Sequence, residues 1–178
     1  MQTPKVNSHP APVGARALVV DDNRVNRALL ASRLKNMGLR VITAEGGQEA
    51  LDTLKAHHAD LVLLDIEMPG LSGFEVLTRI RERFTRAQLP VVMVTAREDE
   101  GDIVRALSEG ANDYIFKKSD FAVIRARVEG QLALKRALDQ FHESRSMESI
   151  SIVTGGIAHE INTPLQYIND NASFIDQA

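Results

Sequence analysis

Five short apolar runs alternate with amphipathic segments between Ala15 and Lys117, and this alternation constrains the fold more than any other feature. Unbroken apolar runs are typical of strands buried on both faces, as in a parallel sheet covered by helices. Strand–helix units in this order predict the α/β class with a doubly wound sheet. The runs are Ala17–Val20, Val41–Thr43, Leu61–Leu64, Val91–Val94 and Tyr114–Phe116.

The segments between the runs have helical spacing and residues that end helices. Gly38 and Gly110 stand where the first and fourth segments stop, and glycine suits the left-handed conformation after a helix. The third segment ends at about Arg83, well before Pro90. We expect helices over residues 23–37, 48–57, 73–83 and 99–109, with a fifth helix starting near Asp120.

Composition narrows the function classes. The chain has 178 residues, a formal net charge of −3 and no cysteine. The charge gives no general basic field, so nucleic-acid binding is not favoured, and disulfides and thiolate metal sites are excluded. Since no apolar run reaches the length of a membrane span and no signal-peptide core is present, we expect a cytoplasmic protein.

Polar residues stand where four of the apolar runs end. Asp21 and Asp22 follow the first run, Asp65 the third, Thr95 the fourth and Lys117 the fifth. In an open parallel sheet these positions meet at the carboxyl edge, where such folds place ligands. Three carboxylates there favour a hard divalent cation, most simply Mg²⁺, and the set suits phosphoryl transfer to a carboxylate.

Each of these residues also has an ordinary structural interpretation. A single aspartate after a strand is usually a turn former or a helix cap, and Asp22 or Asn23 could cap the first helix. The coincidence of all five at matching strand ends favours the functional interpretation.

Longer motifs surround these residues: Val19–Asn23, Leu64–Gly73, Val94–Ala96 and Gly110–Tyr114 with Lys117. These motifs resemble those of response-regulator receiver domains, and the resemblance covers roughly residues 15–140. It implies a flavodoxin-like, five-stranded parallel sheet of strand order 2-1-3-4-5.

The resemblance also implies a role for each residue of the site. Asp65 would be the phosphoacceptor, and Lys117 would pair with the phosphoryl group. Mg²⁺ would be bound by Asp65, by Asp22 directly, by Asp21 through water and by the main-chain carbonyl of Glu67.

The resemblance also implies a pair of switch residues, and the chain differs from the family at one position. Thr95 and Tyr114 would be the switch, the hydroxyl moving toward the phosphate and the ring following inward. The family usually has a cis-proline after the lysine, where this chain has Lys118. That replacement puts the position of Lys117 and the start of the fifth helix in question.

The rest of the chain predicts an arm and a long helix around the receiver. Residues 1–14 are proline-rich and predict a disordered arm before a receiver over 15–120. A narrow apolar stripe with balanced charges over 121–146 predicts an extended fifth helix that forms a coiled coil with a second copy. The stripe resumes over 147–178, which we expect to be a truncated helix.

That last segment contains His159 in the motif Gly155–Leu165. The motif resembles the phosphoacceptor box of sensor histidine kinases. The resemblance implies that His159 is phosphorylated, that Glu160 assists transfer and that Thr163 serves phosphatase or transfer geometry. An ordinary surface histidine on a linker helix is the alternative. The ATP-binding domain of a kinase, and ATP itself, would belong only to a longer parent protein.

We therefore expect a phosphorelay protein in which Mg²⁺-dependent phosphorylation of Asp65 regulates a histidine kinase through a helical dimer. Its partners would be a cognate kinase or phosphotransfer protein, with no nucleic acid and no membrane. A receiver-like dimerisation module without phosphorylation remains an alternative. A haloacid-dehalogenase-type phosphatase is disfavoured because its Asp-x-Asp pattern is missing at the first strand. A transcription regulator is disfavoured by the absence of a basic recognition helix.

Overall fold

The structure is a computed structural model that describes residues 14–96 and 99–144. The chain divides into two compact units, Met1–Arg136 and Ala137–Ala178, and the sheet belongs to the first. All five strands are parallel and lie in the order β2-β1-β3-β4-β5, which confirms the predicted fold. The strands are β1 (Arg16–Val20), β2 (Arg40–Ala44), β3 (Leu61–Asp65), β4 (Val91–Thr95) and β5 (Asp113–Phe116).

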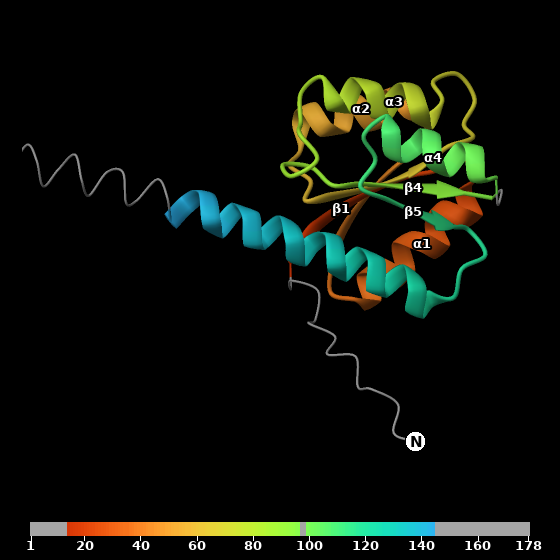
Figure 1. Ribbon diagram of the computed structural model, residues 1–178. Coiled ribbons are helices and arrows are strands. Elements are labelled where there is room, and N and C mark those ends of the chain that lie inside the picture. The colour runs from red at the N-terminus through yellow and green to blue at the C-terminus, as the bar shows by residue number, and fades with distance from the viewer. Residues whose placement is uncertain (1–13, 97–98, 145–178) are drawn as a thin grey trace, which may run out of the picture. The chain divides into compact units, whose positions relative to one another are not determined.

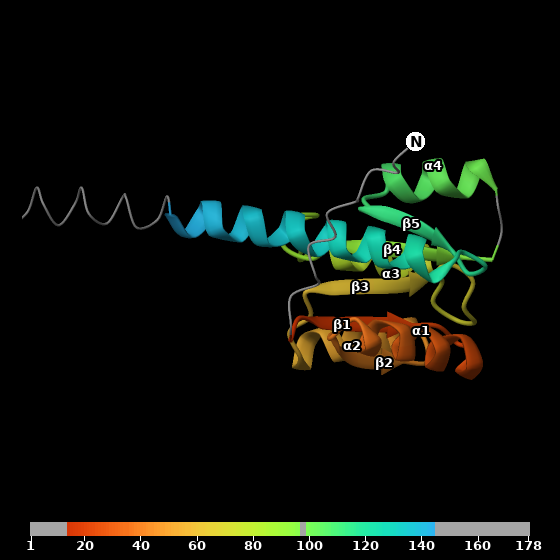
Figure 2. The same ribbon diagram turned by 90° about the horizontal axis from the view of Figure 1, so that it is seen from below.

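Helices cover both faces of the sheet (Figures 1 and 2). α2, α3 and α4 lie on one face, whereas α1 and the helix over residues 121–136 lie on the other. The named helices are α1 (Arg24–Asn36), α2 (Gly47–Ala56), α3 (Gly73–Arg81) and α4 (Glu100–Ser108).

The alternation of side chains along each strand divides the core in two. In β1, Leu18 and Val20 pack toward α3, whereas Ala17 and Val19 pack toward α1 and the helix that starts at residue 121, called the C-terminal helix below. All four side chains are buried, as the unbroken apolar run predicted. A sheet buried on both faces is rigid, so it holds the side chains at its carboxyl edge in fixed positions.

Local signals set the helix ends next to that edge. The side chain of Asn23 accepts hydrogen bonds from the backbone N–H groups of Val25 and Asn26 and so caps α1. Ser72 and Glu75 form a capping box at the start of α3. At the other end of α1, before the start of β2, Gly38 has φ of +86°, as expected for a residue that ends a helix.

The predicted fifth helix is present over residues 121–144. Ile124, Val128 and Leu132 recur at a spacing of four and are buried against the sheet in the first unit. The predicted coiled coil stays a prediction. Residues 1–13 and 145–178 lie outside the described part, and the predicted arm and histidine segment fall within them. Among the described helices, none has both the length and the apolar character needed to cross a bilayer.

The approach of α3 to the end of β3 gives a first prediction. A Cβ atom added at Gly73 would lie 2.1 Å from the carbonyl oxygen of Asp65. We expect Gly73→Ala to lower the free energy of unfolding by roughly 1–3 kcal/mol, because the backbone must move to relieve the overlap. Urea unfolding followed by circular dichroism measures this change.

Gly130→Ala is the matched control. Nothing lies within 4 Å of a Cβ at Gly130, which is exposed within a helix. This variant should gain up to about 1 kcal/mol from helix propensity. Equal unfolding midpoints for Gly73→Ala and the wild type would contradict the tight approach.

Candidate functional site

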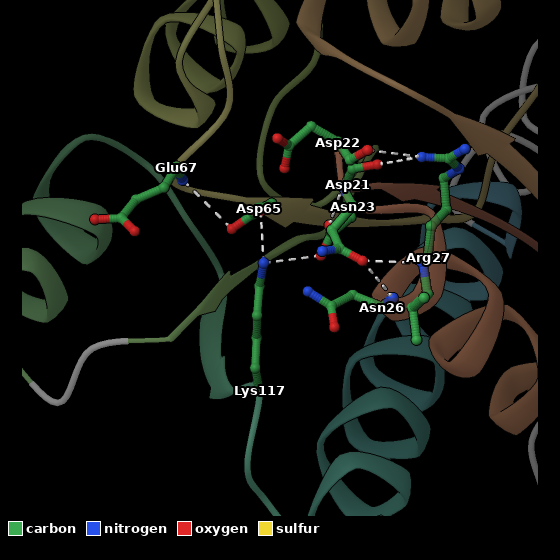
Figure 3. Close-up of polar contacts among 9 residues, drawn as sticks. Asp21, Asp22, Asn23, Asn26, Arg27, Asp65, Glu67 and Lys117 are labelled. Atoms are coloured by element: carbon green, nitrogen blue, oxygen red, sulfur yellow. Dashed lines mark hydrogen bonds and ion pairs between the residues drawn. The ribbon is translucent and has the colours of Figure 1, made fainter.

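Three aspartates converge at the carboxyl edge of the sheet (Figure 3). Asp21 follows β1 and is 2% exposed, and Asp65 ends β3 and is 1% exposed. Asp22, which follows Asp21 in the chain, is exposed to solvent. One carboxylate oxygen from each aspartate lies within 4.8 Å of the others. The structure therefore brings together the acidic residues that the strand-end pattern predicted.

Lys117, directly after β5, contacts two of these three aspartates. Its Nζ is 2.6 Å from Oδ2 of Asp65 and 2.9 Å from Oδ2 of Asp21. The described residues contain no cis peptide bond, so the bond between Lys117 and Lys118 is trans. The replacement of the usual proline by Lys118 thus leaves the lysine in contact with both buried carboxylates.

Backbone N–H groups orient two of the carboxylates. Oδ1 of Asp21 accepts a hydrogen bond from the backbone N–H of Asn23 at 2.9 Å. Oδ1 of Asp65 accepts one from the N–H of Glu67 at 3.3 Å. The carboxylate of Glu67 points away from the aspartates in Figure 3, so its side chain is not part of the cluster.

Burial and neighbouring charges have opposing effects on the pKa values of Asp65 and Lys117. Burial raises the pKa of Asp65, the charge of Asp21 raises it further, and the bond from Lys117 opposes both effects. Burial alone would lower the pKa of Lys117, but its bonds to Asp65 and Asp21 together raise it. The lysine therefore stays charged, whereas the ionised form of Asp65 is held at a cost in free energy.

The donor set fits a divalent cation. The cluster holds three carboxylates, and among the described residues the one ammonium group that contacts it reaches only those of Asp21 and Asp65, which leaves an excess of negative charge when all four groups are ionised. Clustered carboxylate oxygens are the ligands that Mg²⁺ prefers, and Mg²⁺ keeps coordination positions open for water and phosphate oxygens. Asp21, Asp22 and Asp65 are the residues that would hold it.

The two residues predicted as a switch occupy neighbouring strands. Thr95 ends β4 and is 2% exposed, and its carbonyl accepts a hydrogen bond from the N–H of Lys117 at 2.7 Å. Tyr114 on β5 is half-buried, and its ring meets that of Phe116 edge to face. Thr95 thus lies at the same sheet edge as the aspartates, whereas Tyr114 is further back along β5.

Sequence reasoning missed two arginines near these residues. Arg27 on α1 is buried beside the Asp21–Asp22 loop, and Arg127 forms an ion pair with Asp113 beneath the ring of Tyr114. The sequence signal for Arg27 is its place on the buried stripe of α1 that continues with Ala31 and Leu34. His159, Glu160 and Thr163, predicted as a second site, lie outside the described residues.

The fold and the acidic edge together define a class: a flavodoxin-like signalling domain of the CheY type. The chain belongs to the response regulator receiver domain family, whose model matches residues 17–129.

Similar proteins agree with this assignment. The transcriptional regulatory protein AfsQ1 of Streptomyces coelicolor is 37% identical over 76% of this chain and 58% of its own length. Response regulator PleD of Caulobacter vibrioides is 33% identical over 82% of this chain and 32% of its own length. The chain therefore spans less than two thirds of either relative.

A solved structure shares both fold and sequence with the chain. The response regulator TrrA of Thermotoga maritima, in complex with Mg²⁺ and BeF, is 35% identical, with a TM-score of 0.60. The match covers 66% of this chain and 98% of that one.

The raised pKa of Asp65 gives a second prediction. Its ionised form destabilises the fold at pH values above the raised pKa, and the cost disappears as the pH falls toward the ordinary value of 3.8. We expect Asp65→Asn to melt at a higher temperature than the wild type at pH 7 without metal, and the difference to shrink on acidification. Thermal melts across this pH range in a chelating buffer measure it.

Asp52→Asn is the control, because its effect should have the opposite sign. Hydrogen bonds from Lys55 and Gln48 lower the pKa of exposed Asp52. Its ionised form therefore favours the fold, so this variant should gain nothing at pH 7. A stabilisation by Asp65→Asn that grows as the pH falls would refute the assignment of a raised pKa.

Proposed function

We propose that this chain is a phosphorelay receiver in which Asp65 accepts a phosphoryl group. The observation that carries the proposal is the cluster of three carboxylates at the carboxyl edge of the sheet, two of which, those of Asp21 and Asp65, contact the amine of Lys117. Asp65 is almost fully buried and ends β3 at that edge, so a small phosphodonor or a phosphohistidine would approach it there.

The residues divide the chemistry of transfer among them. A carboxylate oxygen of Asp65 attacks phosphorus and forms the new P–O bond, while the bond from phosphorus to the donor atom breaks and the donor leaves with the electron pair. The ammonium group of Lys117, now beside Asp65, would contact a phosphoryl oxygen. The hydroxyl of Thr95 would contact another.

A divalent cation would complete the site. Asp22 and Asp65 would bind Mg²⁺ directly, with Asp21 acting through water and Glu67 through its main-chain carbonyl. When bound, Mg²⁺ offsets the negative charge that the entering phosphoryl group brings to the three carboxylates.

Contacts of β5 suggest how the helix after it would respond. The guanidinium group of Arg127 lies 5.1 Å from the ring centre of Tyr114 and forms an ion pair with Asp113. Any movement of Tyr114 that follows Thr95 therefore disturbs the packing of the C-terminal helix. We include in the proposal that this helix pairs two copies of the chain.

The downstream target would be the motif around His159. In this part of the proposal, phosphorylation of Asp65 alters the presentation of His159 in a dimer, with Glu160 and Thr163 assisting transfer at the histidine. Its support is the sequence motif, and kinase activity would require an ATP-binding domain. The alternative is a receiver used only for dimerisation, which would not need the carboxylates.

A third prediction separates these two functions. Incubation with acetyl phosphate and Mg²⁺ should add one phosphoryl group to the wild type, located at Asp65 by mass spectrometry, and release acetate. Asp65→Asn should remove labelling, and Asp52→Asn, which changes an exposed aspartate on α2, should not. Absence of labelling in the wild type, or its persistence in Asp65→Asn, would favour the dimerisation module.

A fourth prediction concerns the link to the helix. Beryllofluoride with Mg²⁺ should change the dimer affinity of the wild type in analytical ultracentrifugation. Arg127→Ala should reduce that change because it removes the contacts with Asp113 and Tyr114, which together contribute on the order of 1 kcal/mol. Arg125→Ala on the same helix, which contacts Phe121 instead, is the control. Equal responses of both variants would argue against this route.

A further inference from the structure

A buried arginine braces the backbone of the acidic pair. Arg27 on α1 is 8% exposed, although most of its helical neighbours on the outer face are open to solvent. Its Nη1 donates to the carbonyl oxygen of Asp21 at 2.7 Å and to that of Asp22 at 3.3 Å (Figure 3). The two residues whose carbonyls it holds are the two whose carboxylates join Asp65.

The other end of the guanidinium group is held by a different strand. Nη2 of Arg27 forms an ion pair with Oε1 of Glu45, the residue that follows β2. The side chain of Glu45 is 74% exposed, whereas that of Arg27 is 10% exposed. The guanidinium group therefore connects the loop after β1 to the end of the neighbouring edge strand.

The loop has little freedom left with this brace in place. The side chain of Asp21 turns back to the N–H of Asn23, and Asn23 in turn caps α1. The backbone N–H of Asp21 donates to the carbonyl of Ala44. Arg27 holds the carbonyl of Asp22, which shares a peptide group with the N–H of Asn23, and the carbonyl of Asp21 in the preceding peptide group. A rotation of either peptide group would therefore break a bond to Arg27.

The planar guanidinium group of arginine is suited to bracing this loop. Arginine presents several N–H groups in one plane, whereas lysine presents a compact ammonium group on a flexible chain. A lysine at position 27 would keep the charge, but it lacks the planar set of donors that reaches two carbonyls and Glu45 at once. Burial of a guanidinium group is costly unless its donors find acceptors, and here Nη1 bonds to the two carbonyls and Nη2 to Glu45.

We propose that Arg27 is a positioning residue for the cation site, fixing the Asp21–Asp22 peptides so that both carboxylates face Asp65. Through its ion pair, Glu45 holds the guanidinium group of Arg27 in place, and so links an exposed position after β2 to the site. This inference rests on the proposed Mg²⁺ site and adds to it a residue that does not touch the ion. Arg27 acts as the partner that orients the ligands from outside.

The test measures Mg²⁺ affinity directly by isothermal titration calorimetry on the full chain. Arg27→Ala should raise the dissociation constant for Mg²⁺ about 10-fold, as loss of an outer partner of metal ligands does. Arg27→Lys should lie between Arg27→Ala and the wild type. Arg24→Ala removes the same charge from an exposed position of the same helix and should bind as the wild type does.

Kinetics give a readout that a general structural role would not produce. With acetyl phosphate, Arg27→Ala should need more Mg²⁺ for half-maximal labelling of Asp65, while the maximal rate at saturating Mg²⁺ stays close to that of the wild type. Glu45→Ala should shift the Mg²⁺ dependence in the same direction by less. Glu45→Gln, which keeps an acceptor for Nη2, should shift it least.

The outcomes separate this inference from the function on which it rests. If the wild type binds no Mg²⁺, the proposed function fails and the inference fails with it. If the wild type binds Mg²⁺ and Arg27→Ala binds it equally well, only the role of Arg27 is overturned. Should Arg27→Ala not fold, Arg27→Lys decides: wild-type affinity in that variant overturns the inference, and weaker affinity with an unchanged melting temperature supports it.

Discussion

The crowding of three carboxylates at one sheet edge is the constraint on which the rest of the structure depends. Like charges at this distance repel, and two of the three side chains are almost fully buried. The amine of Lys117 offsets part of the repulsion by contacting Asp21 and Asp65 together. The pKa of Asp65 is nevertheless raised, mainly because its carboxylate is buried and to a lesser extent because of the charge of Asp21. Such a site exists only because the surrounding fold holds the acids in place.

That hold comes from parts of the molecule remote from the charges. The strands are buried on both faces, so their ends cannot shift without disturbing two apolar clusters. The first turn of α3 presses against the end of β3 at Gly73, where no side chain fits. On the other side, Asn23 and Arg27 fix the loop after β1. Packing thus supplies the free energy that keeps an electrostatically strained site assembled.

The sequence predicts most of this arrangement because the relevant signals are local. Apolar runs define the strands, and parallel strands bring their carboxyl ends together, so the meeting of Asp21, Asp65 and Lys117 follows from position alone. The contact between Arg27 and Glu45 does not follow in this way. It joins residues 18 apart in the chain, through the register of β1 against β2, and a basic residue on a helix usually faces solvent. The effect of Lys118 was equally beyond local signals, because it depends on how the turn after β5 settles against Thr95.

The position of Lys117 indicates which side of the domain responds to a change at Asp65. Its N–H is bonded to Thr95 at the end of β4, and its amine reaches Asp65 at the end of β3. The turn that follows closes with a bond from the N–H of Ser119 to the carbonyl of Phe116, and the C-terminal helix starts two residues later. A new negative charge on Asp65 would compete for the same amine, so under the proposed function its first mechanical effect would fall on β4, β5 and that turn. The loop after β1 is held by Asn23 and Arg27. This asymmetry would direct the response toward the helix after β5.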